Sequence, residues 1–327
     1  MSIFPTKILV ATDGSREADL AAHTAARIAD ETGSELHIVY VSPRSLLLHP
    51  GHFVGPEVEE HWLQREQELL EREAQLLLDT QVEEIEAAGS SVAQTHLRVG
   101  KADGEIVALG EELGTGLIVV GSRGRSGLRR ALIGSVSDSV VRHAHCPVMV
   151  VRGEENGEAL FSSKRILLAT DGSKDAVLAA SIAADIAQKS ASELHVIHVG
   201  PSVDYDGVGE PLVTDIFAPT EEQIKELNEE LQQLLDAQVR QIEAVGGTVW
   251  QAHLRMGRPD AQIIALAEEI GAGLIVVGSR GLGGIRRALM GSISGSVVRH
   301  AHCPVLVVRK EGTVSGQVGE RERRLGR

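Results

Sequence analysis

The sequence predicts two tandem α/β domains, each a doubly wound parallel sheet of five strands with helices on both faces. Three observations support this fold class. The 327-residue chain is long enough for two domains of about 150 residues each. Its second half repeats the first, and within each half short apolar segments rich in β-branched residues alternate with helical patterns. Continuous apolar strands separated by helices are typical of a parallel sheet buried on both faces.

The repeat is a duplication of a whole domain. Two motifs occur twice: Ala-Thr-Asp-Gly-Ser at 11–15 and 169–173, and Gly-Ser-Arg-Gly at 121–124 and 278–281. When 92–151 is aligned with 249–308 without gaps, 42 of 60 positions are identical. A unit of this length far exceeds any solenoid repeat, which leaves domain duplication as the explanation.

Composition along the chain predicts the domain boundaries. We place the first domain at 1–152 and the second at 164–309. The acidic, glycine-containing segment 153–163 is predicted to be a linker. The segment 310–327 is polar, glycine-rich and charged, so we expect a disordered tail.

The elements of the first half follow from its patterns. Short apolar segments predict strands at 6–12, 36–41, 92–98, 117–120 and 147–151. Helical spacing predicts helices near 15–31, 58–87 and 135–145. The counterpart of the long second helix has apolar residues at steps of three and four: Ile224, Leu227, Leu231, Leu234 and Val239. Such a stripe could be a coiled-coil seam, but a helix that packs on its own sheet is the favoured interpretation.

Charge and hydropathy exclude several classes of partner. The chain has 32 basic and 46 acidic residues, a net charge of −14, which repels the phosphate backbone of nucleic acids. Its longest apolar runs are far shorter than the ~18 residues that a bilayer requires. No secretory signal is visible near the amino terminus, so we expect a cytoplasmic protein. Two cysteines are too few for a disulfide framework.

A glycine-rich loop after the fourth predicted strand is the main chemical signal. It reads Gly-x2-Gly-x9-Gly-Ser, at 121–135 and again at 278–292. Ligands of open α/β sheets bind at the carboxyl ends of the strands, and glycines let the backbone approach an anion. The final Gly-Ser opens a helix whose amino terminus favours a phosphate. The alternative is a loop of turn glycines with Ser135 as a simple helix cap, but two intact copies favour phosphate binding.

Two other phosphate-binding motifs are missing. The chain has no Gly-x4-Gly-Lys-Ser/Thr, so it lacks the lysine that a P-loop places on the β- and γ-phosphates. It also has no Gly-x-Gly-x-x-Gly after the first strand, as a dinucleotide-binding domain would require.

Together, the loop, the Ala-Thr-Asp-Gly-Ser motif and a His-Cys-Pro-Val motif before the last strand resemble the universal stress protein family. The resemblance is to a tandem two-domain form of the ATP-binding branch and covers almost the entire chain. It implies an adenine nucleotide hydrolase-like fold with strand order 3-2-1-4-5. It also implies that the two halves pair through their last strands, and that ATP or ADP binds between the first and fourth strands.

The resemblance also assigns nucleotide-binding positions. In the first half these are Ala11, Thr12, Asp13, Val41, Gly121, Ser122, Arg123, Gly124, Arg125, Gly134, Ser135, Val136 and Ser137. In the second half they are Ala169, Thr170, Asp171, Val199, Gly278, Ser279, Arg280, Gly281, Gly291, Ser292, Ile293 and Ser294. The backbone of Val41 and of Val199 is expected to pair with the adenine edge. Because Leu282 replaces Arg125 in the second loop, we expect tighter binding in the first half.

Asp13 and Asp171 have two interpretations. Asp-Gly-Ser before a helix is a common start signal, so each carboxylate could cap the helix that follows. At the carboxyl end of a strand, however, each could contact a ribose or hold Mg²⁺, which would offset its repulsion of a triphosphate.

The histidines and cysteines favour structural roles. The His-Ala-His-Cys motif at 143–146, repeated at 300–303, could be a transition-metal cluster, but residues two apart do not share a helix face. Histidines at a helix end and a buried cysteine are the favoured interpretation. His96 and His253 lie within the third strand and are predicted to be packing residues.

Three functions remain open at this point. The favoured one is a nucleotide-binding regulatory protein of the stress-response type, with an internal pseudo-dimer of its halves and a possible homodimer of chains. The second is a slow Mg²⁺-dependent adenine-nucleotide hydrolase, and the third a partner-binding module in which nucleotide only orders the loop. The loop contains arginines but no general base, so hydrolysis is expected to be slow or absent.

Overall fold

The computed structural model describes residues 3–43, 56–124, 133–152, 164–201, 220–244, 246–281 and 290–309. The first half contains β1 (Lys7–Thr12), α1 (Arg16–Thr32), β2 (Glu35–Ser42), α2 (Pro56–Ala87), β3 (Gln94–Val99), α3 (Ala102–Leu113), β4 (Leu117–Gly121), α4 (Ser135–His143) and β5 (Val148–Val151). The second half contains β6 (Arg165–Ala169), α5 (Lys174–Lys189), β7 (Glu193–Gly200), α6 (Glu221–Ala244), β8 (Gln251–Met256), α7 (Pro259–Glu269), β9 (Leu274–Gly278), α8 (Ser292–His300) and β10 (Val305–Val308).

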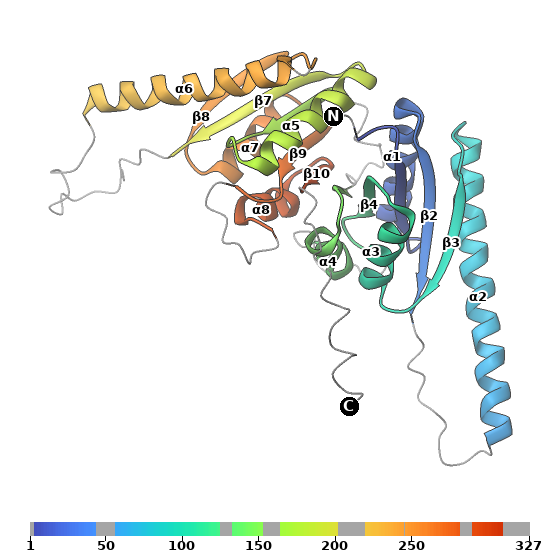
Figure 1. Cartoon of the computed structure of the whole chain (residues 1–327). Coiled ribbons are helices and arrows are strands. Elements are labelled where there is room, and N and C mark those ends of the chain that lie inside the picture. Colours follow the sequence, from blue (N-terminus) through green and yellow to red (C-terminus); the bar gives the residue numbers. More distant parts are fainter. Residues whose placement is uncertain are drawn as a thin grey trace, which may run out of the picture.

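All ten described strands form one sheet (Figure 1). Its order is β3-β2-β1-β4-β5-β10-β9-β6-β7-β8. Within each half the strands are parallel in the order 3-2-1-4-5, which confirms the predicted fold class. The halves join where β5 and β10 pair antiparallel, and this confirms the predicted pairing of the last strands.

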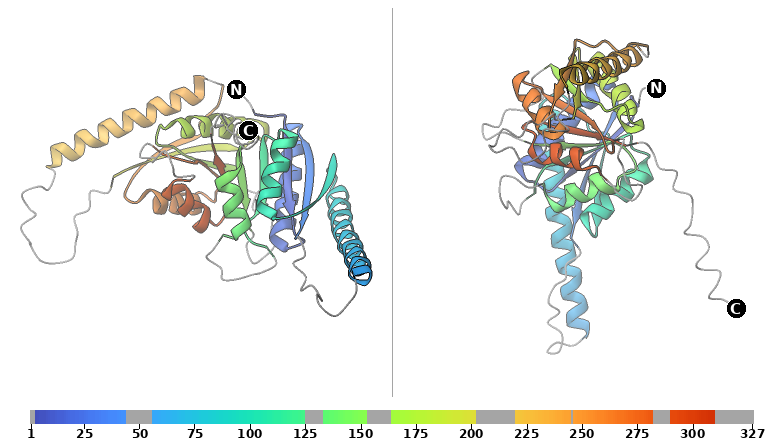
Figure 2. Two further views of the ribbon diagram at one scale, coloured as in Figure 1. Left: turned by 60° about the horizontal axis from the view of Figure 1, so that its bottom comes forward. Right: turned by 90° about the vertical axis from the view of Figure 1, so that its left-hand side faces the viewer.

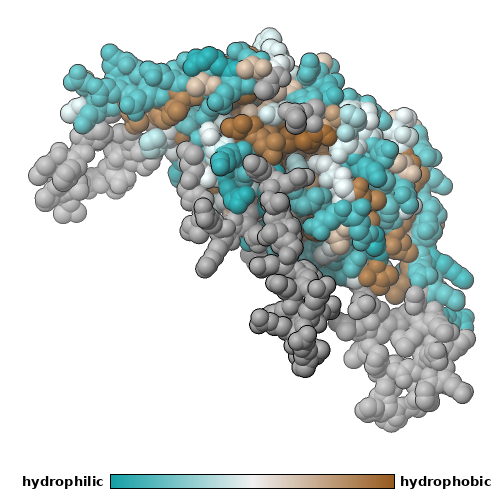
Figure 3. Space-filling view, viewed as in Figure 1, coloured by the Kyte–Doolittle hydropathy of each residue, from teal (hydrophilic) through white to brown (hydrophobic). Residues whose placement is uncertain are grey.

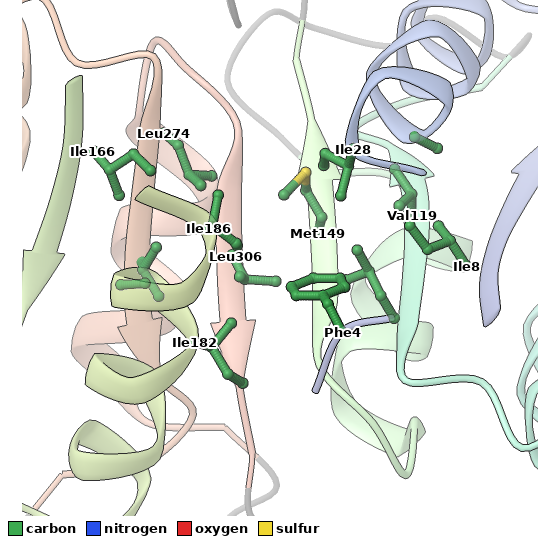
Figure 4. Close-up of a cluster of buried hydrophobic side chains, with 14 of the residues drawn as sticks. Phe4, Ile8, Ile28, Val119, Met149, Ile166, Ile182, Ile186, Leu274 and Leu306 are labelled. Atoms are coloured by element: carbon green, nitrogen blue, oxygen red, sulfur yellow. The ribbon is translucent and has the colours of Figure 1, made fainter. Parts of the chain in front are cut away.

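The register of this central pair defines a pseudo-two-fold axis. Met149 is opposite Leu306, the residue that corresponds to it in the other half, and both side chains are fully buried. The flanking pairs are Val148 with Val307 and Val150 with Val305. The register is therefore symmetric about Met149 and Leu306, and Figure 4 shows Phe4 beside this seam. Pairing the two edges satisfies backbone groups that would otherwise invite association with another chain.

Helices cover both faces of the sheet (Figure 2). The apolar residues of α1, α2, α5 and α6 form one buried cluster with one face, and those of α3, α4, α7 and α8 form a second cluster with the other. Successive strand residues alternate between the clusters, as Leu9 and Val10 do, because side chains of a strand point to opposite faces. The long helices α2 and α6 pack on their own sheet, as predicted. Of the stripe predicted on α6, Leu231 is buried, but Leu234 is 52% exposed and its neighbour Leu235 is buried in its place.

The element bounds differ little from those expected, with one exception. The structure contains the helices α3 and α7, which the sequence pattern did not predict. Gly104 and Gly110 weaken the helical pattern of α3. Gly110 packs so closely on the sheet that a β-carbon there would lie 3.0 Å from Ile118 Cδ1, which accounts for its small size.

The predicted linker and tail, 153–163 and 310–327, lie outside the described residues, so the domain boundaries stay a prediction. Among the helices that are described, none is both long and apolar enough to cross a membrane. The surface in Figure 3 is mostly hydrophilic, with hydrophobic residues in small groups.

Candidate functional site

Two equivalent cavities lie at the carboxyl ends of the strands, one in each half. The first pocket has a volume of about 610 Å³ and the second about 580 Å³, both within the usual range for small-molecule sites. The first opens where β1 lies between β2 and β4, so that the chain order of the sheet reverses there. Such a switch point is where open α/β sheets bind ligands.

Most of the predicted positions line these pockets. In the first pocket they are Ala11, Thr12, Asp13, Val41, Gly121, Arg123, Gly124, Gly134, Ser135, Val136 and Ser137. In the second they are Ala169, Thr170, Asp171, Val199, Gly278, Arg280, Gly281, Gly291, Ser292, Ile293 and Ser294. Arg125, with its counterpart Leu282, lies outside the described residues.

Ser122 and Ser279 lie behind the pocket walls rather than on them. Ser122 is fully buried, and its backbone N–H donates to Val151 O at 2.7 Å, while its carbonyl accepts from Gly134 N at 2.7 Å. Ser279 makes the equivalent bonds with Val308 and Gly291. These two serines therefore tie the loop to the last strand of their own half.

An apolar wall opposite the loop was not predicted. In the first pocket it includes Val39 and Val120 from the sheet and Ala102 and Ile106 from α3. In the second, Ile197, Val277, Pro259 and Ile263 take these places. Apolar residues at i and i+4 in the first turns of a helix after the third strand are the signal that could have found this wall.

The helices α4 and α8 begin at the pocket, each after a glycine that has no side chain to cap it. Their N-cap residues are Gly134 and Gly291, and neither cap makes a side-chain hydrogen bond within the described structure. By contrast, Ser15 caps α1, since its hydroxyl accepts from Ala18 N at 3.3 Å, and Ser173 caps α5 in the same way. The alternative of Ser135 as a simple cap is not observed. Unpaired N–H groups at a helix amino terminus favour an anion.

Gly121 and Gly124 each lack a side chain for a different structural reason. A β-carbon on Gly121 would lie 2.8 Å from the backbone carbon of Glu17, so this glycine lets β4 approach α1. A β-carbon on Gly124 would instead overlap the carboxylate of Asp13 inside the pocket. Ser137 also supports the loop, because its hydroxyl donates to Gly121 O at 2.6 Å.

The described arginine of each loop is paired with an acidic residue at the start of the first helix of its half. Arg123 Nη2 lies 3.1 Å from Glu17 Oε1, and Arg280 Nε lies 3.3 Å from Asp175 Oδ2. The shorter Asp175 also accepts from Ser279 Oγ at 2.8 Å. In the first half the longer Glu17 leaves the buried Ser122 hydroxyl with no hydrogen-bond partner among the described residues. The two pockets thus differ in how their loops are anchored.

Asp13 and Asp171 face the pockets and do not cap the helices. Asp13 Oδ1 accepts from Ser15 N at 3.0 Å, and Asp171 repeats this bond with Ser173. The helix caps themselves are the serines. In the part of the chain that the structure describes, no three His, Cys, Asp or Glu residues gather as a metal site.

Four histidines form two pairs that the sequence did not indicate. His37 Nδ1 lies 3.1 Å from His96 Nε2, and His195 pairs with His253 at 3.2 Å, at the end of the sheet away from the pockets. His143, in the last turn of α4, lies 2.8 Å from Ser139 O.

Both cysteines are buried. Cys146 is 4% exposed and Cys303 is 1% exposed. Burial raises the pKa of the Cys303 thiol to about 12, so the thiol stays protonated near neutral pH.

The fold and the paired cavities define a tandem doubly wound α/β protein with one ligand-sized pocket at each switch point. A model of the universal stress protein family matches residues 5–152 and 162–309, so the chain belongs to this family. Both halves are matched, which establishes the tandem form.

Relatives and solved structures agree over nearly the whole length. A universal stress protein from Mycolicibacterium smegmatis is 30% identical over 311 residues, which cover 92% of this chain and 96% of the relative. One from Mycobacterium bovis is 30% identical over 319 residues, covering 92% and 94% of the two chains. The crystal structure of a universal stress protein from Archaeoglobus fulgidus has 26% sequence identity and a TM-score of 0.66, covering 93% of this chain and 98% of that one.

Proposed function

We propose that this universal stress protein binds ATP or ADP in each of its two pockets and acts as a cytoplasmic regulatory protein in a stress response. The observation that carries the proposal is the pair of helix amino termini, α4 and α8, which open onto the pockets without a side-chain cap. Their N–H groups and helix dipoles suit the phosphates of a nucleotide.

The two walls of each pocket match the two ends of a nucleotide. The apolar wall of the first pocket, which includes Val41 and Ile106, suits the adenine ring. The loop from Gly121 to Gly124, with Arg123, faces it and suits the ribose and phosphates. This division of the lining favours a nucleotide over a purely apolar or purely anionic ligand.

The charges of the pocket favour a nucleotide that brings a cation with it. Arg123 is already paired with Glu17, and Asp13 adds a second carboxylate. A triphosphate beside two carboxylates and one arginine is stabilised by Mg²⁺, which would take oxygens from the phosphates and from Asp13. Asp171 has the same place in the second pocket.

The pocket favours binding over hydrolysis. Among the described lining residues, the ionisable side chains are Asp13 and Arg123 in the first pocket, and Asp171 and Arg280 in the second. Neither pocket shows a lysine or histidine in that lining to act on a γ-phosphate. A slow Mg²⁺-dependent hydrolysis, in which the aspartates hold the metal, is the second candidate.

The proposal is tested on the purified full-length chain. Protein is denatured, and the released small molecules are identified by mass spectrometry; ATP or ADP near two equivalents per chain is expected. Nucleotide-free protein is then titrated with ATP and Mg²⁺ by calorimetry. If no adenine nucleotide is released and none binds, the proposed function is wrong. A multiple-turnover assay of phosphate release, compared with Asp13→Ala/Asp171→Ala, separates binding from hydrolysis.

A further inference from the structure

Two arginines cross the seam between the halves. Arg309 directly follows β10, yet its guanidinium reaches the last turn of α4 in the other half. Its Nη1 donates to Arg142 O at 2.7 Å and to Ala144 O at 3.3 Å, and its Nη2 donates to Val141 O at 3.1 Å. Arg152, the corresponding residue after β5, reaches α8 in return.

The reciprocal contact is weaker. Arg152 Nη2 donates to Val298 O at 3.3 Å, and Val298 corresponds to Val141. Within the described residues the structure thus gives α4 three bonds from the opposite half and α8 one. An arginine thus donates to a helix end of the opposite half on both sides of the pseudo-two-fold axis, but with a different number of hydrogen bonds.

These contacts suit the chemistry of a helix end. The last carbonyl groups of a helix have no partners within it, and a cation there interacts favourably with the dipole. The planar fork of an arginine can donate to several carbonyls at once, which a lysine cannot do in the same geometry. Arg309 therefore anchors the carboxyl end of α4.

The other end of α4 lines the first pocket. Ser135, Val136 and Ser137 are pocket residues, and this helix of nine residues spans about 14 Å. Along its side, Ser139 Oγ donates to Asp103 Oδ2 of α3 at 2.6 Å. Because a short helix moves as one body, an anchor at its carboxyl end also sets the position of its amino-terminal N–H groups.

Arg309 also lies next to the loop of its own half. The carbonyl of Val308 accepts from Ser279 N at 2.6 Å, immediately before the pocket residue Arg280. Burial lowers the pKa of Arg309, and the nearby charge of Arg280 lowers it further, whereas Asp175 raises it. The arginine is thus placed between the second pocket's loop and the first pocket's helix.

We propose that Arg309 and Arg152 are positioning residues supplied across the seam, so that each ligand pocket is completed by the opposite half. The first pocket depends on Arg309 more than the second depends on Arg152. The inference rests on the proposed function for its ligand, but not for the anchoring of the helix.

The test uses the full-length chain in a Gly281→Val background, which blocks the second pocket and leaves the first to be measured. Arg309→Ala is compared with Arg152→Ala, its symmetry-related control, and with Arg309→Lys, which keeps the charge without the fork. ATP affinity is measured by calorimetry, and amide hydrogen exchange is measured for the peptide covering 138–144. In this background Arg309→Ala should weaken ATP binding roughly three- to tenfold, in line with the strength of a cation at a helix end.

The expected exchange result is local: faster exchange in the α4 peptide of Arg309→Ala, unchanged exchange in the central strands, and an intermediate effect for Arg309→Lys. Arg152→Ala should leave α4 exchange unchanged, because the Arg152 guanidinium bonds to α8. Unchanged α4 exchange in Arg309→Ala overturns the proposal, and so does faster exchange with unchanged affinity. If even the unsubstituted chain binds no ATP, the proposed function fails, and the exchange result alone decides the anchoring role.

Discussion

Gly124 and Asp13 lie so close together in the first pocket that a β-carbon on Gly124 would overlap the Asp13 carboxylate. Gly281 and Asp171 repeat this relationship, with 2.5 Å between the added carbon and Asp171 Oδ2. The neighbour in both cases is the end of a side chain, which can move without disturbing the backbone. A side chain at either glycine would therefore change the pocket and leave the fold intact.

Gly124→Val should abolish ATP binding in the first pocket, and Gly281→Val in the second. The valine displaces the aspartate and fills the space through which phosphates approach the loop. Each variant is expected to titrate with one equivalent of ATP in place of two. Gly104→Ala is the control, since its added carbon meets nothing within 4 Å. Unchanged affinity together with an unchanged circular dichroism spectrum would remove this loop from the site.

Gly121→Ala should destabilise the first half, because its added β-carbon meets the backbone of α1. Its β-carbon would lie 2.8 Å from backbone carbon of Glu17, so β4 and α1 must move apart. Overpacking of this kind costs about 1–3 kcal/mol of unfolding free energy. Gly104→Ala, within helix α3, should instead raise that free energy by roughly 0.5–1 kcal/mol. Urea denaturation measures both, and equal stability of the two variants would contradict the assigned role of Gly121.

Asp13→Asn/Asp171→Asn should remove the effect of Mg²⁺ on ATP binding. Asparagine retains the oxygen that accepts from the backbone N–H of Ser15, so the turn before α1 persists while the charge is lost. Wild-type protein is expected to bind ATP roughly tenfold more tightly with Mg²⁺ than with a chelator, and the variant equally in both. A variant that keeps the full Mg²⁺ effect would show that the metal is held elsewhere.

Arg125→Leu should lower the affinity of the first pocket towards that of the second. Arg125 lies outside the described residues, so this prediction rests on the sequence, in which Leu282 stands at the equivalent position. The measurement compares Gly281→Val with Gly281→Val/Arg125→Leu, so that only the first pocket is titrated. A loss of roughly three- to tenfold is expected for one charge-assisted contact to a phosphate. Equal affinities would mean that this arginine does not contact the nucleotide.

The histidine pairs should make the free energy of unfolding depend on pH between about 7 and 5. Burial lowers the pKa of His37, and burial also lowers the pKa of its partner His96, whose value the charge of His37 lowers further. His195 and His253 repeat both shifts. A pKa below its unfolded value of about 6.5 means that the unfolded chain binds more protons. Stability is therefore highest above pH 6.5 and is lost as pH falls below it.

The charged groups near the first pair partly oppose this effect. Glu35, at 3.6 Å from His37 Nε2, raises the pKa of His37, and Lys7 lowers it. Around His96, Arg98 lowers the pKa and Glu112 raises it.

Thermal unfolding of the wild type, followed at each pH, should show Tm falling from pH 7 to pH 5. His96→Gln/His253→Gln should show a shallower fall, and a flat wild-type profile would contradict the assignment.

How far the sequence predicts the site differs from residue to residue. Gly121, Gly124 and Asp13 could be placed because they lie at the ends of recognisable strands, and strand ends of a parallel sheet meet at one edge. Val41 was placed by the family resemblance. Ser122 was placed in the pocket by its motif, yet the loop turns it inward to bond with β5. Ile106 was missed because it lies on a helix whose pattern is weakened by glycine.

The sequence by itself determined the duplication, the strand pattern, the strand order implied by family resemblance and the position of the glycine loop. The strand order came from the resemblance alone. The other three are properties of local periodicity and spacing, and they repeat at 157 or 158 residues in both halves. The pairing of β5 with β10 could also be predicted, because an apolar last strand leaves a sheet edge with unpaired backbone groups.

Only the tertiary structure decided which distant side chains meet. The contact of Arg309 with α4 spans 165 to 168 residues of sequence, and that of Arg152 with α8 spans 146. The hydrogen bond between His37 and His96 joins positions 59 apart on neighbouring strands. No local pattern encodes such pairs, because they depend on the register of strands and on how closely helices pack against the sheet. The physical reason is that sequence periodicity specifies which face of an element is buried, whereas the opposing residue is selected by packing of the whole fold.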